Sequence, residues 1–306
     1  MINPLTLLSV LTFAASVHAA VTIDYVTVGD AGNAADTTGY GAVAYNFQIG
    51  KFEVTNAQYA EFLNNKAASD PNGLFNASMG SNARGGITQN GVSGSFTYTV
   101  KANMGDKPVN YVSFSDAMRF TNWINNGQGS SSTEIGAYDM TVAATTVIHS
   151  SAATVWLPTE NEWYKAAYYQ PVGAGGDNDN YWLYATQSNT IPTVGTVDAN
   201  GNITNDGANV ANYGSGAIWN SQTGNVTTVG SAGASSDSYY GAYDLGGNVF
   251  EWNEAIISNV RGLRGGSWNS HRERPCAPRT ATTARPRSRT APSGSVSQVL
   301  SRNLHA

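Results

Sequence analysis

All 32 aromatic residues of this 306-residue chain lie before residue 271, while only 12% of the chain is charged. The charged fraction is about half that of an average globular protein. A disordered chain has the opposite composition, rich in charge and poor in rings. Because 33 glycines accompany the rings, the sequence predicts a compact, loop-rich body with a core of aromatic side chains.

Charge is divided unevenly along the chain. Residues 271–306 contain seven Arg, no Lys and one Glu, whereas residues 1–270 contain nine Lys and Arg against twenty Asp and Glu. The two parts therefore carry +6 and −11, and the net charge of −5 gives no reason to expect a nucleic-acid partner. We expect residues 271–306 to form a disordered basic tail outside the fold.

The N-terminus has the pattern of an export signal. Residues 5–17 form a mostly apolar stretch of signal-peptide length, too short to span a bilayer, and Val17-His18-Ala19 is typical of a cleavage site. We expect residues 1–19 to be removed and the protein to be secreted, periplasmic or held at the cell surface, without a transmembrane helix. The alternative is that this stretch forms a buried first strand or helix.

Three segments combine a helix-capping pattern with apolar residues at helical spacing. The predicted caps are Thr55 with Gln58, Ser113 or Ser115, and Thr159 with Glu162. Strand-like runs lie near 21–28 and 47–52. Between these elements, the stretches 66–106, 127–152 and 170–238 are rich in Gly, Asn, Ser and Thr but also contain rings, which indicates ordered loops with short strands. Trp156, Trp163 and Trp252 are interpreted as core residues.

Five segments together resemble the formylglycine-generating enzyme, or sulfatase-modifying factor, family. In the family's order they are IGKFEVTNAQYAEFLN (49–64), PVNYVSFSDAMRFTNWIN (108–125), VWLPTENEWYKAA (155–167), GAYDLGGNVFEW (241–252) and LRGGSW (263–268). The resemblance implies an α+β, C-type-lectin-like fold across residues 20–270. Such a fold has few helices, short strands and much ordered loop.

The fourth segment carries oxygen donors suited to calcium. Asp244 and Glu251 flank a glycine pair that lets backbone carbonyls approach closely. The resemblance implies a calcium site here, formed by Asp244, Glu251 and the carbonyls of Gly247 and Val249. It also implies a second site that begins at Asn212 and Tyr213, with further ligands between residues 220 and 238. The alternative for the first site is a glycine turn with a capped carboxylate.

The family's oxidases hold copper with two cysteines that this chain lacks. By resemblance the first belongs at Ser270 and the second at Pro275, and the chain's single cysteine, Cys276, is one position away. A serine hydroxyl cannot replace a thiolate as a copper(I) ligand. We therefore expect no copper and no catalytic residue.

Histidine is equally scarce in the body of the protein. The related sulfoxide synthases hold iron with three histidines, whereas His149 is the only histidine between residues 20 and 270. A three-histidine iron site is therefore excluded, and His149 is interpreted as an ordinary loop residue.

The tail has a composition that suggests a change of reading frame near Ser270. One frame away, codons for residues 274–281 permit LRSSYR and those for 291–299 permit VGFRVA, both similar to the end of the family domain. This hypothesis predicts that the native closing strand is missing. The alternative is a genuine basic arm for an anionic surface.

Three functions follow from these patterns. The first is a secreted, non-catalytic module that binds a glycan, a peptide or an envelope component. The second is a formylglycine-generating oxidase that acts on a sulfatase cysteine. The third is a poorly folded product of a frameshifted gene.

Overall fold

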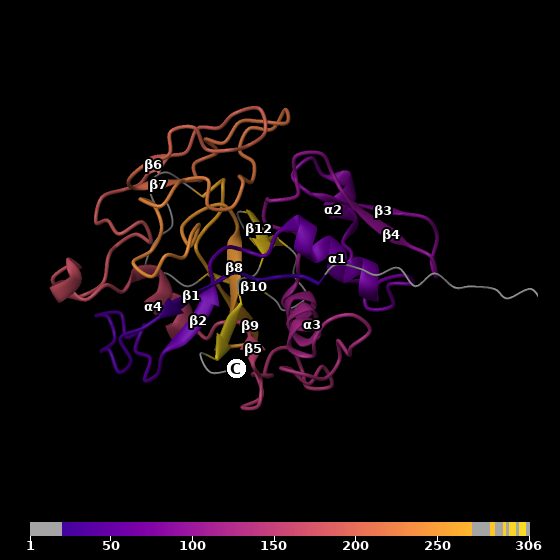
Figure 1. Ribbon diagram of the computed structural model, residues 1–306, viewed down its shortest axis with the longest axis horizontal. Coiled ribbons are helices and arrows are strands. Elements are labelled where there is room, and N and C mark those ends of the chain that lie inside the picture. Colours follow the sequence, from indigo (N-terminus) through magenta and orange to yellow (C-terminus); the bar gives the residue numbers. More distant parts are fainter. Residues whose placement is uncertain (1–19, 271–281, 285–289, 292–293, 298–299, 304–306) are drawn as a thin grey trace, which may run out of the picture.

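The computed structural model describes residues 20–270, 282–284, 290–291, 294–297 and 300–303. Its helices are α1 (Asn56–Lys66), α2 (Ala77–Ser81), α3 (Phe114–Asn125) and α4 (Glu160–Tyr168), with one 3-10 turn, η1 (Val172–Ala174). In Figure 1, α1, α2 and α3 gather at one end of an elongated molecule, and α4 lies toward the other. Long loops fill much of the space between these elements, as the glycine content predicts.

Within the described residues the strands form four sheets. The first sheet has the order β1-β2-β13-β5, the second β10-β9-β8-β12-β11, and the other two are the pairs β3-β4 and β6-β7. The strands of the first sheet are β1 (Tyr25–Val28), β2 (Phe47–Gly50), β5 (Val155–Trp156) and β13 (Ser301–Asn303). Those of the second are β8 (Phe250–Ile257), β9 (Val260–Arg264), β10 (Thr282–Ala284), β11 (Thr290–Ala291) and β12 (Gly294–Ser297). The pairs are β3 (Ile87–Asn90) with β4 (Thr97–Val100), and β6 (Thr193–Val194) with β7 (Val210–Ala211).

Two aromatic clusters form the main core. Between α1 and α3, the ring of Phe62 lies 5.3 Å from those of Phe120 and Trp123. Around α4, Trp163 and Tyr168 are fully or almost fully buried and lie 5.8 Å apart. The expectation that Trp156, Trp163 and Trp252 are core residues is confirmed, because all three are buried.

The three long helices begin where the capping patterns predict. Thr55, Ser113 and Thr159 are the N-caps, and each forms a capping box with the residue three positions later. At α4, the Glu162 backbone N–H donates to Thr159 Oγ1 at 3.2 Å, and the Thr159 N–H donates to Glu162 Oε2 at 2.7 Å. Because Glu162 is fully buried, this box also fixes a carboxylate inside the protein.

Removal of the Thr159 hydroxyl should therefore destabilise the protein. We expect Thr159→Ala to lower the free energy of unfolding by about 1 kcal/mol, the usual cost of losing an N-cap oxygen. Thr159→Ser keeps that oxygen and should remain close to the parent. Urea unfolding followed by circular dichroism measures both, and equal stability of the Ala and Ser variants would contradict the capping role.

The C-terminal residues contribute to both large sheets. The sequence predicts a disordered tail after residue 270 and a missing closing strand, whereas the structure places β10 to β13 there. β13 pairs on one side with β2 and on the other with β5. A strand pairs through its backbone, so Ser301–Asn303 can occupy the position between β2 and β5 without a family motif. The hypothesis of a changed reading frame concerns the gene and stays a prediction.

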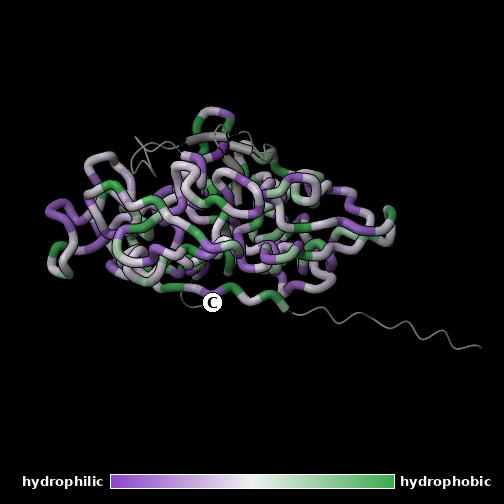
Figure 2. The backbone as a smooth tube through the Cα atoms, turned by 90° about the horizontal axis from the view of Figure 1, so that it is seen from above, coloured by the Kyte–Doolittle hydropathy of each residue, from purple (hydrophilic) through white to green (hydrophobic). Residues whose placement is uncertain are grey.

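Hydrophobic and hydrophilic residues alternate in short stretches along the backbone (Figure 2). Among the residues that the structure describes, no helix combines the length and the apolar content needed to cross a bilayer. The predicted signal segment, residues 1–19, lies outside the described residues.

Candidate functional site

The segment from Asp244 to Glu251 folds back on Asn212. Asp244 and Asn248 have φ angles of 57° and 54°, and Gly247 has φ 101°. A Cβ atom on Gly247 would lie 2.4 Å from the carbonyl oxygen of Asn212, so only glycine fits. The structure therefore places Asn212, which begins the second predicted calcium site, against the segment 244–251, which forms the first predicted site.

Three carboxylates lie in this region. Glu251 and Glu53 are 0% and 1% exposed. Glu53 accepts hydrogen bonds from Asn248 Nδ2 at 2.8 Å and from the Val249 N–H at 3.3 Å. Asp244 accepts from the Gly230 N–H at 2.6 Å, and Glu251 accepts from the indole N–H of Trp163.

Among the residues that the structure describes, these carboxylates have no positive partner. No Lys, Arg or His in the described part of the chain forms an ion pair with Glu53, Asp244 or Glu251. Burial raises the pKa of Glu251 to about 8 and the pKa of Asp244 to about 6. Burial, with the charges of Asp244 and Glu251, also raises the pKa of Glu53 well above its usual range. Without a cation, Glu251 and Glu53 favour their protonated forms near neutral pH, and a bound cation would favour the ionised carboxylates.

Two buried oxygen atoms that accept no hydrogen bond from the described residues also favour cation binding. Glu251 Oε1 and Asn212 Oδ1 are buried and accept no hydrogen bond from the residues that the structure describes. Carboxylate and amide oxygens are ligands that calcium prefers. Within the described residues, no three His, Cys, Asp or Glu side chains converge closely enough to hold a metal. A cation here would therefore also need backbone carbonyls, as the predicted set with Gly247 and Val249 provides.

Asn212 and Tyr213, which begin the second predicted site, both form hydrogen bonds within the fold. Asn212 Nδ2 donates to the Asn225 carbonyl at 2.9 Å and to Asn248 Oδ1 at 3.2 Å. Asn225 belongs to the range 220–238, in which the resemblance implies further ligands. The Tyr213 carbonyl accepts from the Gly216 N–H at 3.1 Å. The sequence analysis did not identify Glu53 as a site residue. The feature that could have identified it is the presence of an acidic residue within the apolar run that continues from β2.

A protein-family model describes the same architecture. Residues 27–294 match the sulfatase-modifying factor enzyme 1-like domain, which is most of the chain. The chain belongs to this family. A search of the curated proteins found no match to the sequence.

Two solved structures share the sulfatase-modifying-factor-like α+β fold. The crystal structure of CarF is 20% identical, with a TM-score of 0.54, and the match covers 92% of this chain and 99% of CarF. Treponema denticola variable protein 1 is 18% identical, with a TM-score of 0.54, and the match covers 94% of this chain and 97% of that protein. At these identities the likeness establishes the fold alone.

Ser270, where the family resemblance places the first copper-binding cysteine, has a structural contact. Its hydroxyl accepts a hydrogen bond from the Ser267 N–H at 2.9 Å, and its own N–H donates to the Ser267 carbonyl at 2.9 Å. The hydroxyl therefore closes the turn that follows β9. Pro275 and Cys276, the positions at and beside the expected second cysteine, lie outside the described residues.

Proposed function

We propose that this protein is an exported, non-catalytic member of the sulfatase-modifying factor family that binds calcium and an external glycan, peptide or envelope component. The observation that carries the proposal is Ser270. Its hydroxyl closes a turn at the position of the first copper-binding cysteine, and the chain contains a single cysteine in all. Copper(I) sites in proteins depend on soft sulfur ligands. A single cysteine cannot supply the pair of thiolates that the family's copper site uses.

Calcium is the metal that the donor set favours. Asp244 and Glu251 supply hard anionic oxygens, and the unpaired Glu251 Oε1 and Asn212 Oδ1 are available to a cation. A bound calcium ion would hold the segment 244–251 against Asn212. Its role in this proposal is to rigidify the loops that present a ligand-binding surface. Export rests on the N-terminal sequence pattern alone.

The competing function is the oxidase activity that the family resemblance implies. A formylglycine-generating oxidase must bind copper and convert a cysteine of a sulfatase peptide. The test is isothermal titration with calcium and with copper(I), followed by mass spectrometry of a cysteine-containing sulfatase peptide incubated with the protein, copper and oxygen. We expect calcium binding and an unchanged peptide. Conversion of the cysteine to formylglycine would overturn the non-catalytic proposal.

The external ligand is open to a direct screen. The protein, purified with calcium, is applied to arrays of glycans and peptides, and Glu251→Gln serves as the variant with a weakened calcium site. We expect binding that depends on calcium and decreases in the variant. Equal ligand binding in the presence of calcium and of a chelator would show that ligand recognition does not depend on calcium.

A further inference from the structure

His149 is joined to a buried carboxylate on the second sheet. Its Nδ1 lies 2.8 Å from Glu254 Oε2, and its backbone N–H donates to Glu254 Oε1 at 3.1 Å. Its ring stacks on that of Trp156, with centroids 5.0 Å apart and planes 16° apart. The sequence predicted an ordinary loop residue, but His149 has a specific partner in β8.

The same carboxylate anchors a second point of the loop. The Tyr138 hydroxyl donates to Glu254 Oε1 at 2.5 Å and accepts from the Leu157 N–H at 2.9 Å. Glu254 is 7% exposed and Tyr138 is fully buried. One carboxylate of β8 therefore fixes both ends of the segment 138–149.

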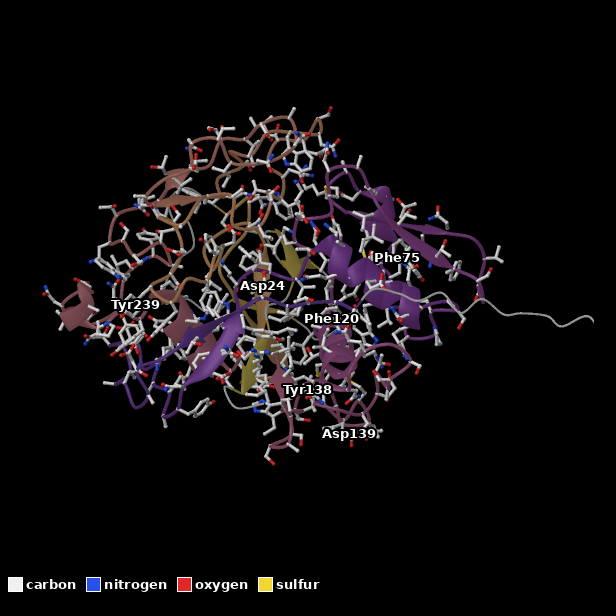
Figure 3. All side chains as sticks on the ribbon, in the orientation of Figure 1. Asp24, Phe75, Phe120, Tyr138, Asp139 and Tyr239 are labelled. Carbon is white, nitrogen blue, oxygen red and sulfur yellow. The ribbon has the colours of Figure 1, made fainter. Side chains whose placement is uncertain are left out.

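Arg261 of β9 holds the middle of this segment. Its guanidinium donates to the carbonyls of Ala144 and Val147, at 2.8 and 2.5 Å, and to the Glu254 carbonyl at 2.8 Å. In Figure 3, Tyr138 and Asp139 lie toward the lower edge of the molecule, and of these two neighbours Tyr138 is buried and Asp139 is exposed. The contacts from Glu254 and Arg261 attach the loop to the β8–β9 hairpin.

The loop carries a pocket of about 460 Å³. Ile135, Val142 and Ile148 line it, and these side chains are 64%, 43% and 64% exposed. Exposed apolar side chains that lie together mark candidate interaction sites. The position of the segment 138–149 decides where Val142 and Ile148 lie.

We propose that His149 and Glu254 form a pH-sensitive latch that fixes the segment 138–149 and thereby the shape of this pocket. The charged groups that act on the imidazole are Glu254 of β8 and Glu162 of α4. The phenols of Tyr138 and Tyr45 donate to these two carboxylates. Arg261 of β9 donates to backbone carbonyls of the loop and of β8, on either side of the His149–Glu254 pair. His149 is the only histidine between residues 20 and 270, so no other imidazole acts on this loop from that part of the chain.

The direction of the response follows from these neighbours. Burial lowers the pKa of His149, but the hydrogen bond to Glu254 and the charges of Glu254 and Glu162 outweigh it and raise the pKa above its ordinary value. A raised imidazole pKa means that the folded latch favours the protonated ring. Its contribution is complete below the unfolded pKa, near 6.5, and is lost as the pH rises through the folded pKa. The latch is therefore tight at mildly acidic pH and weak at alkaline pH.

Hydrogen exchange of the full chain measures the latch directly. Exchange into peptides that cover 138–150 is followed by mass spectrometry from pH 5.5 to 8.5 and corrected for the intrinsic pH dependence. We expect a several-fold loss of protection in the parent as the pH rises, and no such loss in His149→Gln. Peptides from the β3–β4 hairpin are the internal control, and they should show no loss in either protein.

A second measurement reads the titration of His149 in the parent protein. The pKa of His149 in the parent is read from its imidazole proton resonance in an NMR titration, assigned by its absence in His149→Gln or His149→Phe. We expect a pKa above 6.5. A pKa at or below that value, or equal pH dependence of the loop in parent and variant, would overturn the latch. Neither outcome bears on calcium binding, so the proposed function is tested separately.

Discussion

Without calcium, the free energy of unfolding should fall as the pH rises from about 5 to 8, and saturating calcium should remove this fall. Glu251 is the main reason, because burial raises its pKa from 4.5 to about 8. Between these values the folded state holds a proton that the unfolded state has released, so stability decreases with pH. The resulting loss is on the order of 3 kcal/mol at pH 7.

Calcium opposes this loss of stability. A divalent cation stabilises the ionised carboxylate and lowers its pKa, because opposite charge favours the charged form. The stabilisation by calcium should therefore be small near pH 5 and largest near pH 8. Differential scanning calorimetry at four pH values, with either EDTA or calcium, measures the shift in melting temperature.

Glu251→Gln isolates the carboxylate. The variant should be more stable than the parent at pH 8 in EDTA, because it no longer buries an unpaired charge, and it should respond little to calcium. Asp24→Asn, at an exposed carboxylate, is the matched control and should behave as the parent does. A calcium-induced shift of equal size in Glu251→Gln and the parent would place the metal elsewhere.

Local sequence signals predicted the helices well. Thr55, Ser113 and Thr159 are N-caps in the structure because each hydroxyl and the residue three positions on satisfy backbone N–H groups within one turn. Such contacts depend on neighbours in the sequence, so the pattern alone reveals them. The burial of Trp163 and Trp252 was equally readable, since large rings in a chain of low charge must form its core.

Contacts between distant segments were harder to read. Glu53 reaches Asn248 across 195 positions, and His149 reaches Glu254 across 105, so no local pattern marks either residue. The family resemblance located the segment 244–251 but gave no reason to include Glu53. The strands of the tail were hard to read for a similar reason, because strand pairing by backbone groups leaves little trace in side-chain composition.

Leu300 and β13 provide the second large effect. Leu300 is 1% exposed and belongs to the main aromatic and aliphatic cluster, and its carbonyl accepts from the Gly50 N–H at 2.7 Å. We expect Leu300→Ala to cost about 2–5 kcal/mol, the usual range for a buried leucine. Ile218→Ala, at a side chain that is 63% exposed, should cost less than about 0.5 kcal/mol.

A chain that ends at residue 299 should lose still more stability. Without β13, the strands β2 and β5 have no partner between them, because Ser301 pairs with both Ile49 and Trp156. Thermal melting followed by circular dichroism compares this shortened chain with the full chain and with a version whose reading frame is restored after Ser270. If the shortened and full chains melt together, the tail lies outside the cooperative fold as its composition predicts. If the restored chain melts highest, the segment VGFRVA fills the gap between β2 and β5 better than β13 does, which is the result that the frame hypothesis requires.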